Sequence, residues 1–179
     1  MNAEMTNAET TNAETKNSDF VITREFAGPR ELLWACFTDP ERMKRWWGPK
    51  GCTIVASKMD LRVGGTYHGA MRDPAGNVMW AKFVFREVHP PQRLVWVHSF
   101  SDEACGITRH PLSATWPLEL LTTVTFEEAP GGNTRVTLRW SPRNASAEER
   151  KTFDQAHDSM TGGWSGSFEQ LDAYLASLR

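Results

Sequence analysis

The chain has 179 residues, of which 40% are hydrophobic and 23% are charged, and its formal net charge is −2 at pH 7. This composition is typical of one globular domain with a sizeable core, and so small a net charge gives no general attraction to nucleic acid or acidic membranes. Without an apolar run long enough to span a bilayer or the pattern of a signal peptide, the sequence predicts a cytoplasmic protein with neither nucleic acid nor membrane as a partner.

The first segment is repetitive. Residues 2–16 consist of three five-residue units, each beginning Asn-Ala-Glu. The units offer almost no apolar side chain to bury, and a segment without buried surface cannot offset the entropy lost on ordering. We therefore predict a flexible low-complexity tail over residues 1–18, followed by one domain over residues 19–179.

The domain is predicted to begin with a strand over 20–26. Pro29 suits the first turn of a helix that runs to about Thr38. A second short helix follows, with Asp39 as its N-cap and Pro40 at its first position. The hydrophobic period then changes to two, which predicts six more strands. Their approximate ranges are 52–59, 65–72, 78–88, 93–100, 119–128 and 133–140.

Residues 101–117 interrupt this series without any periodic pattern. Loops of this length are uncommon in compact domains and often act as lids or binding loops. Beyond the last strand, Ser146 and Glu149 form the sequence pattern of a capping box. The apolar steps of three or four that follow predict one amphipathic helix over 146–178, about 50 Å long. Its stripe consists of Phe153, His157, Met160, Trp164, Phe168, Leu171, Leu175 and Leu178.

Three glycines lie inside this predicted helix, where each costs about 1 kcal/mol relative to alanine. Close packing of the helix backbone over the sheet or a kink would explain this cluster, and we expect the helix to break or bend here. The glycines are Gly162, Gly163 and Gly166.

Strands joined by short turns pair in an antiparallel sheet, and one face of that sheet must pack on the helix. The prediction is therefore an α+β domain. A sheet of six to seven strands wraps around a long C-terminal helix, with two short helices after the first strand. Such an arrangement often leaves a cavity between the sheet and the helix.

Six local motifs occur in order along this pattern. They are Phe-Thr-Asp-Pro-Glu at 37–41, Trp-Trp-Gly-Pro at 46–49, Val-Gly-Gly at 63–65, Met-Arg-Asp-Pro-Ala-Gly at 71–76, Glu-Val-His-Pro-Pro-Gln-Arg-Leu at 87–94 and Gly-Trp-Ser-Gly-Ser-Phe at 163–168.

With the element order, these motifs resemble the helix-grip fold of START and Bet v 1-like (SRPBCC) proteins. Within that superfamily they are similar to the branch named for its homology to the activator of the heat-shock-protein-90 ATPase. The resemblance covers about residues 19 to 178. It implies hydrophobic ligand binding, lipid transport, polyketide cyclisation or a co-chaperone role, in a stress-related setting.

Eight Trp and nine Phe are many for this length, and large rings both fill cores and line pockets for apolar ligands. Strand alternation places Phe83 with Phe85, and Trp96 with His98 and Phe100, on common faces. A concave face would make these rings a pocket floor, and a convex face would make them an exposed protein interface. The predicted ligand-binding residues are Trp46, Trp47, Tyr67, Met71, Trp80, Phe83, Phe85, Trp96, His98, His157, Met160, Trp164 and Phe168.

Catalysis would require acid and base groups inside the cavity. The candidates are His157, His98, Tyr67 and Glu87. His157 occupies a core-facing helix position, where a buried histidine more often has a structural partner. No nucleophile elbow, metal motif or phosphate loop accompanies these residues.

The cysteines add no further chemistry. Cys36, Cys52 and Cys105 are odd in number and form neither a CxxC pair nor a short Cys/His spacing. This pattern argues against a disulfide framework and a structural zinc site. Cys105 and His110 lie near each other in the predicted loop but lack a third orienting group. We expect no metal and no cofactor.

The sequence thus favours a non-catalytic domain that binds a small hydrophobic or aromatic molecule between the sheet and the helix. One alternative is an enzyme of the polyketide cyclase or hydratase kind. The other is a co-chaperone module whose partner is a chaperone. The chain is expected to be a monomer or a homodimer.

Overall fold

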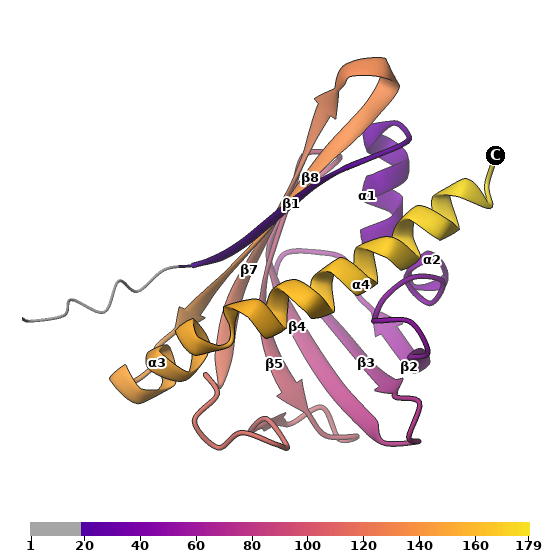
Figure 1. Cartoon of the computed structure of the whole chain (residues 1–179). Helices are drawn as coiled ribbons and strands as arrows, with labels where there is room; N and C mark the ends of the chain where they lie inside the picture. Colours follow the sequence, from indigo (N-terminus) through magenta and orange to yellow (C-terminus); the bar gives the residue numbers. More distant parts are fainter. Residues whose placement is uncertain (1–18) are drawn as a thin grey trace, which may run out of the picture.

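The computed structural model describes residues 19–179, so the predicted tail over residues 1–18 lies outside the described part. Figure 1 shows a curved sheet crossed by one long helix. The elements in chain order are β1 Phe20–Phe26, α1 Arg30–Thr38, α2 Pro40–Met43, β2 Thr53–Met59, β3 Thr66–Arg72, β4 Val78–His89, β5 Arg93–Ser101, β6 Ile107–Thr108, β7 Glu119–Ala129, β8 Asn133–Arg143, α3 Ala147–Gln155 and α4 His157–Ala176, with a short 3₁₀ turn at Pro130–Gly132 between β7 and β8.

The strands form one antiparallel sheet in the order β1-β8-β7-β5-β4-β3-β2, with β6 added beside β5. All seven predicted strands are present, and their ends agree with the prediction to within three residues. The register pairs Phe83 of β4 with Tyr67 of β3 and with His98 of β5. These three side chains therefore lie in one row across the sheet, because paired residues of antiparallel strands share a face. The predicted α+β helix-grip fold is confirmed.

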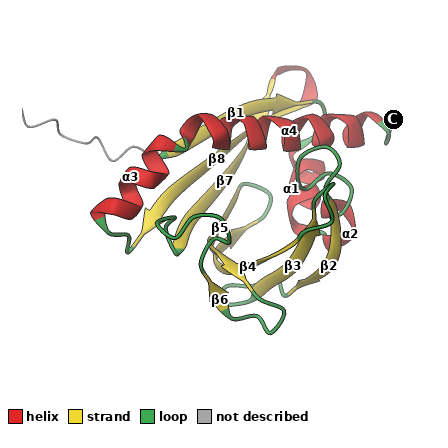
Figure 2. Cartoon of the chain, turned by 60° about the horizontal axis from the view of Figure 1, so that its bottom comes forward, coloured by secondary structure: helices red, strands yellow, loops and turns green. Residues whose placement is uncertain are grey.

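Helix α4 lies across the concave face of the sheet, and Figure 2 shows the strands curling beneath it, with α1 and α2 at one end. The C-terminal half of α4 is embedded in the core. Phe168 meets the Phe26 ring of β1 edge-on at 5.2 Å between centroids, and Leu171 and Leu175 are buried beside it. The apolar stripe of the helix and the concave sheet face therefore form one continuous core.

The prediction of a single C-terminal helix is wrong, because the segment forms two helices. Ser146 and Glu149 make the predicted capping box at the start of α3. The helical conformation is interrupted at Ala156, with φ −93° and ψ 2°, and α3 turns away from the axis of α4 (Figure 2). The apolar spacing continues across this residue, so periodicity alone did not reveal the break.

The kink expected at the glycine cluster is also wrong, since α4 continues through all three glycines. Close packing does not require glycine at Gly166 either, because a Cβ at this position would make only ordinary van der Waals contact. A Cβ built there would lie 3.7 Å from Cβ of Pro49, in the loop between α2 and β2. No atom lies within 4 Å of a Cβ built at Gly162 or Gly163, so close packing does not explain those two positions.

The 101–117 segment carries more structure than the sequence indicated. Its two-residue strand β6 pairs with Phe100 and Ser101 at the end of β5. Ser101 Oγ donates a hydrogen bond to the Gly106 carbonyl at 2.7 Å. Arg109 forms an ion pair with Glu149 of α3, and Thr152 of α3 hydrogen-bonds Thr115 at 2.8 Å. The segment is therefore fastened to both the sheet and α3.

The burial of α4 predicts unequal effects of two leucine truncations. Leu171→Ala removes a side chain with 0% exposure and should lower the free energy of unfolding by about 3 kcal/mol, since it leaves a cavity. The matched change Leu178→Ala, at a leucine that is 47% exposed, should cost less than about 0.5 kcal/mol. Urea denaturation followed by tryptophan fluorescence measures both values, and equal losses would contradict this description of the core.

Candidate functional site

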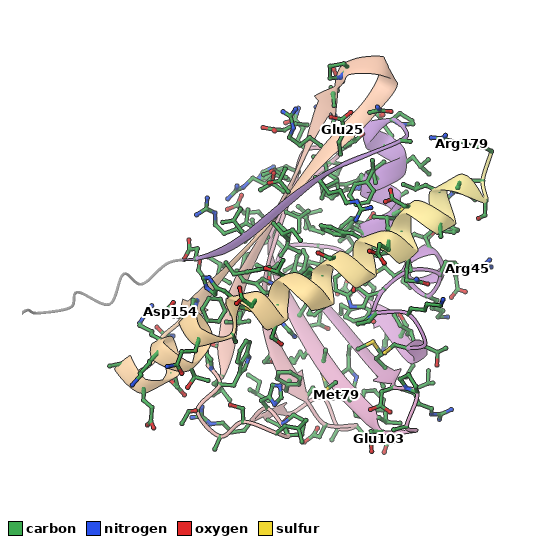
Figure 3. The ribbon with its side chains drawn as sticks, in the orientation of Figure 1. Glu25, Arg45, Met79, Glu103, Asp154 and Arg179 are labelled. Carbon is green, nitrogen blue, oxygen red and sulfur yellow. The ribbon has the colours of Figure 1, made fainter. Side chains whose placement is uncertain are left out.

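A pocket of about 480 Å³ lies between α4 and strands β3, β4 and β5. Figure 3 shows the side chains that occupy the space between the helix and the sheet, with Met79 of β4 labelled. Trp47, Gly48 and Pro49 border the pocket from the α2–β2 loop, and His110 and Trp116 border it from the 101–117 segment. The walls therefore come from the sheet, the helix and two loops that are remote in sequence.

Most of the predicted ligand-binding residues line this pocket. Trp96 and His98 face α4 together with Phe83, so these rings occupy the concave face and form the pocket floor. This position answers the question that strand alternation left open. The predicted residues that line the pocket are Trp47, Tyr67, Met71, Trp80, Phe83, Trp96, His98, Met160 and Trp164.

Three predicted aromatic residues lie in the core instead of the pocket. Trp46 is buried, and its Nε1 donates to the Cys36 carbonyl at 2.9 Å. Phe85 lies on the same face as Phe83 but further along β4, where it is almost fully buried. Phe168 packs against Phe26. Strand alternation predicts on which face of the sheet a side chain lies. It does not predict at which positions along the strand the pocket lies between the sheet and α4.

Two of the four candidate acid–base residues are also outside the pocket. His157 lies between the rings of Phe20 and Phe153, at 5.8 and 5.4 Å between centroids. Glu87 lies on the sheet beyond the pocket and accepts a hydrogen bond from Arg93 at 2.8 Å, which holds the pKa of Glu87 below its usual value. Only His98 and Tyr67 of this set border the pocket.

Several lining residues were not among the predicted ligand-binding residues. Phe100 follows the same alternation as His98, so the sequence contained a signal for it. His110 and Trp116 belong to the segment without periodicity, and Trp140 lies on β8, which only the strand order brings near. Gly163 borders the pocket through its backbone. The sequence marked the 101–117 segment as a candidate binding loop, but no local pattern singled out these last four as pocket residues.

The pocket lining contains no Lys, Arg, Asp or Glu. Its titratable groups are Tyr67, His98 and His110, and all three are neutral at pH 7. Burial raises the pKa of Tyr67, lowers that of His110, and lowers that of His98 from 6.5 to about 4. A charged ligand would thus find no counter-ion here, which makes its desolvation costly.

The edge of the pocket is formed by apolar or small residues. Ser159 and Gly163 of α4 are exposed, as is Pro49 opposite them, whereas Met71 and Met79 are partly buried. All five line the pocket, so the exposed ones mark where it meets solvent. Methionine side chains adapt their shape easily, which suits an entrance for apolar molecules.

No group of three or more His, Cys, Asp or Glu side chains within residues 19–179 is placed to hold a metal ion. The helices of that same range include none with both the length and the apolar character needed to cross a bilayer.

Comparison with known proteins gives a consistent result. The family profile described as "Activator of Hsp90 ATPase homolog 1-like protein" matches residues 27–176. Protein NE0264 of Nitrosomonas europaea is 26% identical, with a TM-score of 0.71 over 90% of this chain and 96% of that one. Protein Ms6760 of Mycobacterium smegmatis is 27% identical, with a TM-score of 0.71 over 88% and 90%. A protein from Arthrobacter aurescens is also 27% identical, with a TM-score of 0.71 over 89% and 86%. No curated protein matches the chain.

The low pKa of His98 predicts acid sensitivity of the fold. Between pH 6.5 and about 4 the unfolded chain binds a proton at this residue while the folded chain does not. Stability is therefore complete above pH 6.5 and falls as the pH drops. Between about pH 7.5 and pH 5 the free energy of unfolding should fall by about 2 kcal/mol more in the wild type than in His98→Phe.

Denaturant titrations of both proteins at the two pH values measure this difference. Because other acidic groups titrate equally in the two proteins, they cancel in the comparison. Identical pH dependence of wild type and variant would show that His98 is not held neutral by burial.

Proposed function

This chain belongs to the Activator of Hsp90 ATPase homolog 1-like family, and we propose that its pocket reversibly binds a small hydrophobic or aromatic molecule without chemical conversion. The observation that carries the proposal is a pocket of about 480 Å³ walled mostly by rings and lacking any charged lining residue. Its volume lies in the range of small-molecule sites. The ring-lined floor supplies the contact area that aromatic ligands favour.

Catalysis is less well supported by the same geometry. A general base works best with a pKa near the operating pH, whereas burial lowers the pKa of His98 to about 4. Burial also raises the pKa of Tyr67, which makes its hydroxyl a weaker acid than that of a free tyrosine. Neither group is tuned for proton transfer near neutral pH. The pocket therefore favours binding over a cyclase or hydratase reaction.

The co-chaperone alternative depended on an exposed aromatic surface. Among residues 19–179 the exposed large hydrophobic residues are all aliphatic, and the ring clusters that suggested an interface line the pocket or the core. Residues 19–179 therefore present no exposed aromatic surface of the kind that the co-chaperone alternative required.

Gly163 offers a direct way to test the pocket. On α4, Met160, Gly163 and Ser167 follow one another in steps of three and four, which places them on one helical face, and all three line the pocket. Nothing lies within 4 Å of a Cβ at Gly163. A larger side chain there has room to extend over the pocket entrance. The neighbouring Gly162 is about 100° further around the helix and does not line the pocket.

We expect Gly163→Leu to weaken binding of the neutral apolar dye N-phenyl-1-naphthylamine at least tenfold, because the new side chain occupies its space. The matched variant Gly162→Leu should bind like the wild type. Both changes should stabilise α4 by about 0.8 kcal/mol, since leucine has the higher helix propensity. Fluorescence titration measures affinity, and thermal melts verify folding.

Two results would count against the proposal. A wild-type protein that binds neither this dye nor any compound of a lipid and aromatic panel would refute ligand binding. Equal affinities of the two leucine variants would place the bound dye outside the pocket.

A further inference from the structure

One side chain on the pocket floor lacks a protein partner. His98 lies at the centre of the sheet, where β5 pairs with β4 on one side and with β7 on the other. Among residues 19–179 none hydrogen-bonds its imidazole, whereas His68 is bonded to the Asp102 carbonyl at 2.9 Å and His110 accepts from the Leu112 amide at 3.0 Å. The His98 side chain is only partly buried and borders the pocket, so its ring is open to a partner that a ligand supplies.

Three aromatic rings pack around the imidazole of His98. Its ring centroid lies 5.3 Å from Phe83, 5.9 Å from Phe100 and 5.7 Å from Trp140. Its cross-strand neighbour on β7 is Leu120. A polar ligand group that meets His98 is therefore surrounded by rings, where a hydrogen bond has little competition from water.

The chemistry of a neutral imidazole limits what it can bind. It presents one N–H donor and one nitrogen acceptor, and a hydroxyl group can either accept from the first or donate to the second. A carboxylate or phosphate would need a cation, and the lining has no Lys or Arg. An ammonium group would need a carboxylate, and the lining has no Asp or Glu.

Two other polar groups of the pocket lining, the hydroxyls of Tyr67 and Ser167, are directed elsewhere. A Cβ at Gly69 would come within 2.3 Å of the Tyr67 hydroxyl, so that hydroxyl lies against the backbone of β3. Ser167 of α4 donates its hydroxyl to the Gly163 carbonyl at 3.1 Å. His98 is thus the pocket group best placed to recognise a polar atom of the ligand.

We propose that the pocket selects uncharged, flat aromatic molecules that carry a hydroxyl group, and that His98 hydrogen-bonds this hydroxyl at the pocket floor. This inference rests on the proposed ligand-binding function and adds the chemical class of the ligand. The rings of the lining contact the flat body of the molecule, and His98 determines its orientation.

Three probes that share one fused ring system test the proposal: naphthalene, 2-naphthol and 2-naphthoate. The ratio of 2-naphthol affinity to naphthalene affinity should fall about tenfold from wild type to His98→Phe, because the hydroxyl then loses its partner. The affinity for naphthalene itself should persist. In the wild type, 2-naphthoate should bind at least tenfold more weakly than 2-naphthol.

Tyr67→Phe is the matched control, since it removes the other polar side chain from the row of Tyr67, Phe83 and His98. In this variant the ratio of 2-naphthol affinity to naphthalene affinity should equal that of the wild type. His98→Gln should retain a larger ratio than His98→Phe, because an amide still donates and accepts. The ¹⁵N signals of the His98 ring should shift in the wild type on adding 2-naphthol and shift less on adding naphthalene.

The possible failures are distinguishable. If neither naphthalene nor 2-naphthol binds the wild type, this inference and the proposed function both fail. If both bind and the ratio is unchanged in His98→Phe, or changes in Tyr67→Phe instead, His98 is not the recognition group although ligand binding stands. Tighter binding of 2-naphthoate than of 2-naphthol would refute the selection for uncharged molecules.

Discussion

The structure depends on the contact between the C-terminal half of α4 and the concave face of the sheet. Phe168, Leu171 and Leu175 are buried there, and a helix is stiff over this length. Anchoring one half therefore determines the height of the other half above the sheet. In that N-terminal half, Ser159 and Gly163 are too small to fill the space beneath them, and the pocket occupies it.

The same arrangement explains why the pocket is uncharged. Its floor is the middle of a sheet whose rings pack against one another, and a charge placed there would lose its hydration without gaining a partner. Histidine is tolerated because it can lose its proton and become neutral. The pKa of His98 is lowered because burial disfavours the protonated imidazole. Loops close the two ends of the pocket: the α2–β2 loop and the 101–117 segment. An ion pair between Arg109 and Glu149 fastens the 101–117 segment to α3.

Much of the fold was predictable because its signals are local. Alternation and turn residues located all seven main strands, and Ser146 with Glu149 located the start of α3. The helix break at Ala156 could not be predicted from the sequence pattern, since the apolar spacing is the same on both sides of this residue. The three glycines suggested a kink, but helical hydrogen bonding tolerates glycine where neighbouring packing holds the helix. The short strand β6 was missed because two residues carry no period.

For the site, the sequence by itself determined which residue types were available and which faces of the strands they shared. It grouped Trp96 with His98, and it identified most of the rings that line the pocket. Only the tertiary structure decided that this face is concave, that Phe85 lies in the core while Phe83 lies in the pocket, and that Trp140 and Trp116 reach the same space. The physical reason is that side-chain direction follows from the local backbone, whereas a cavity is what remains after distant elements have packed together.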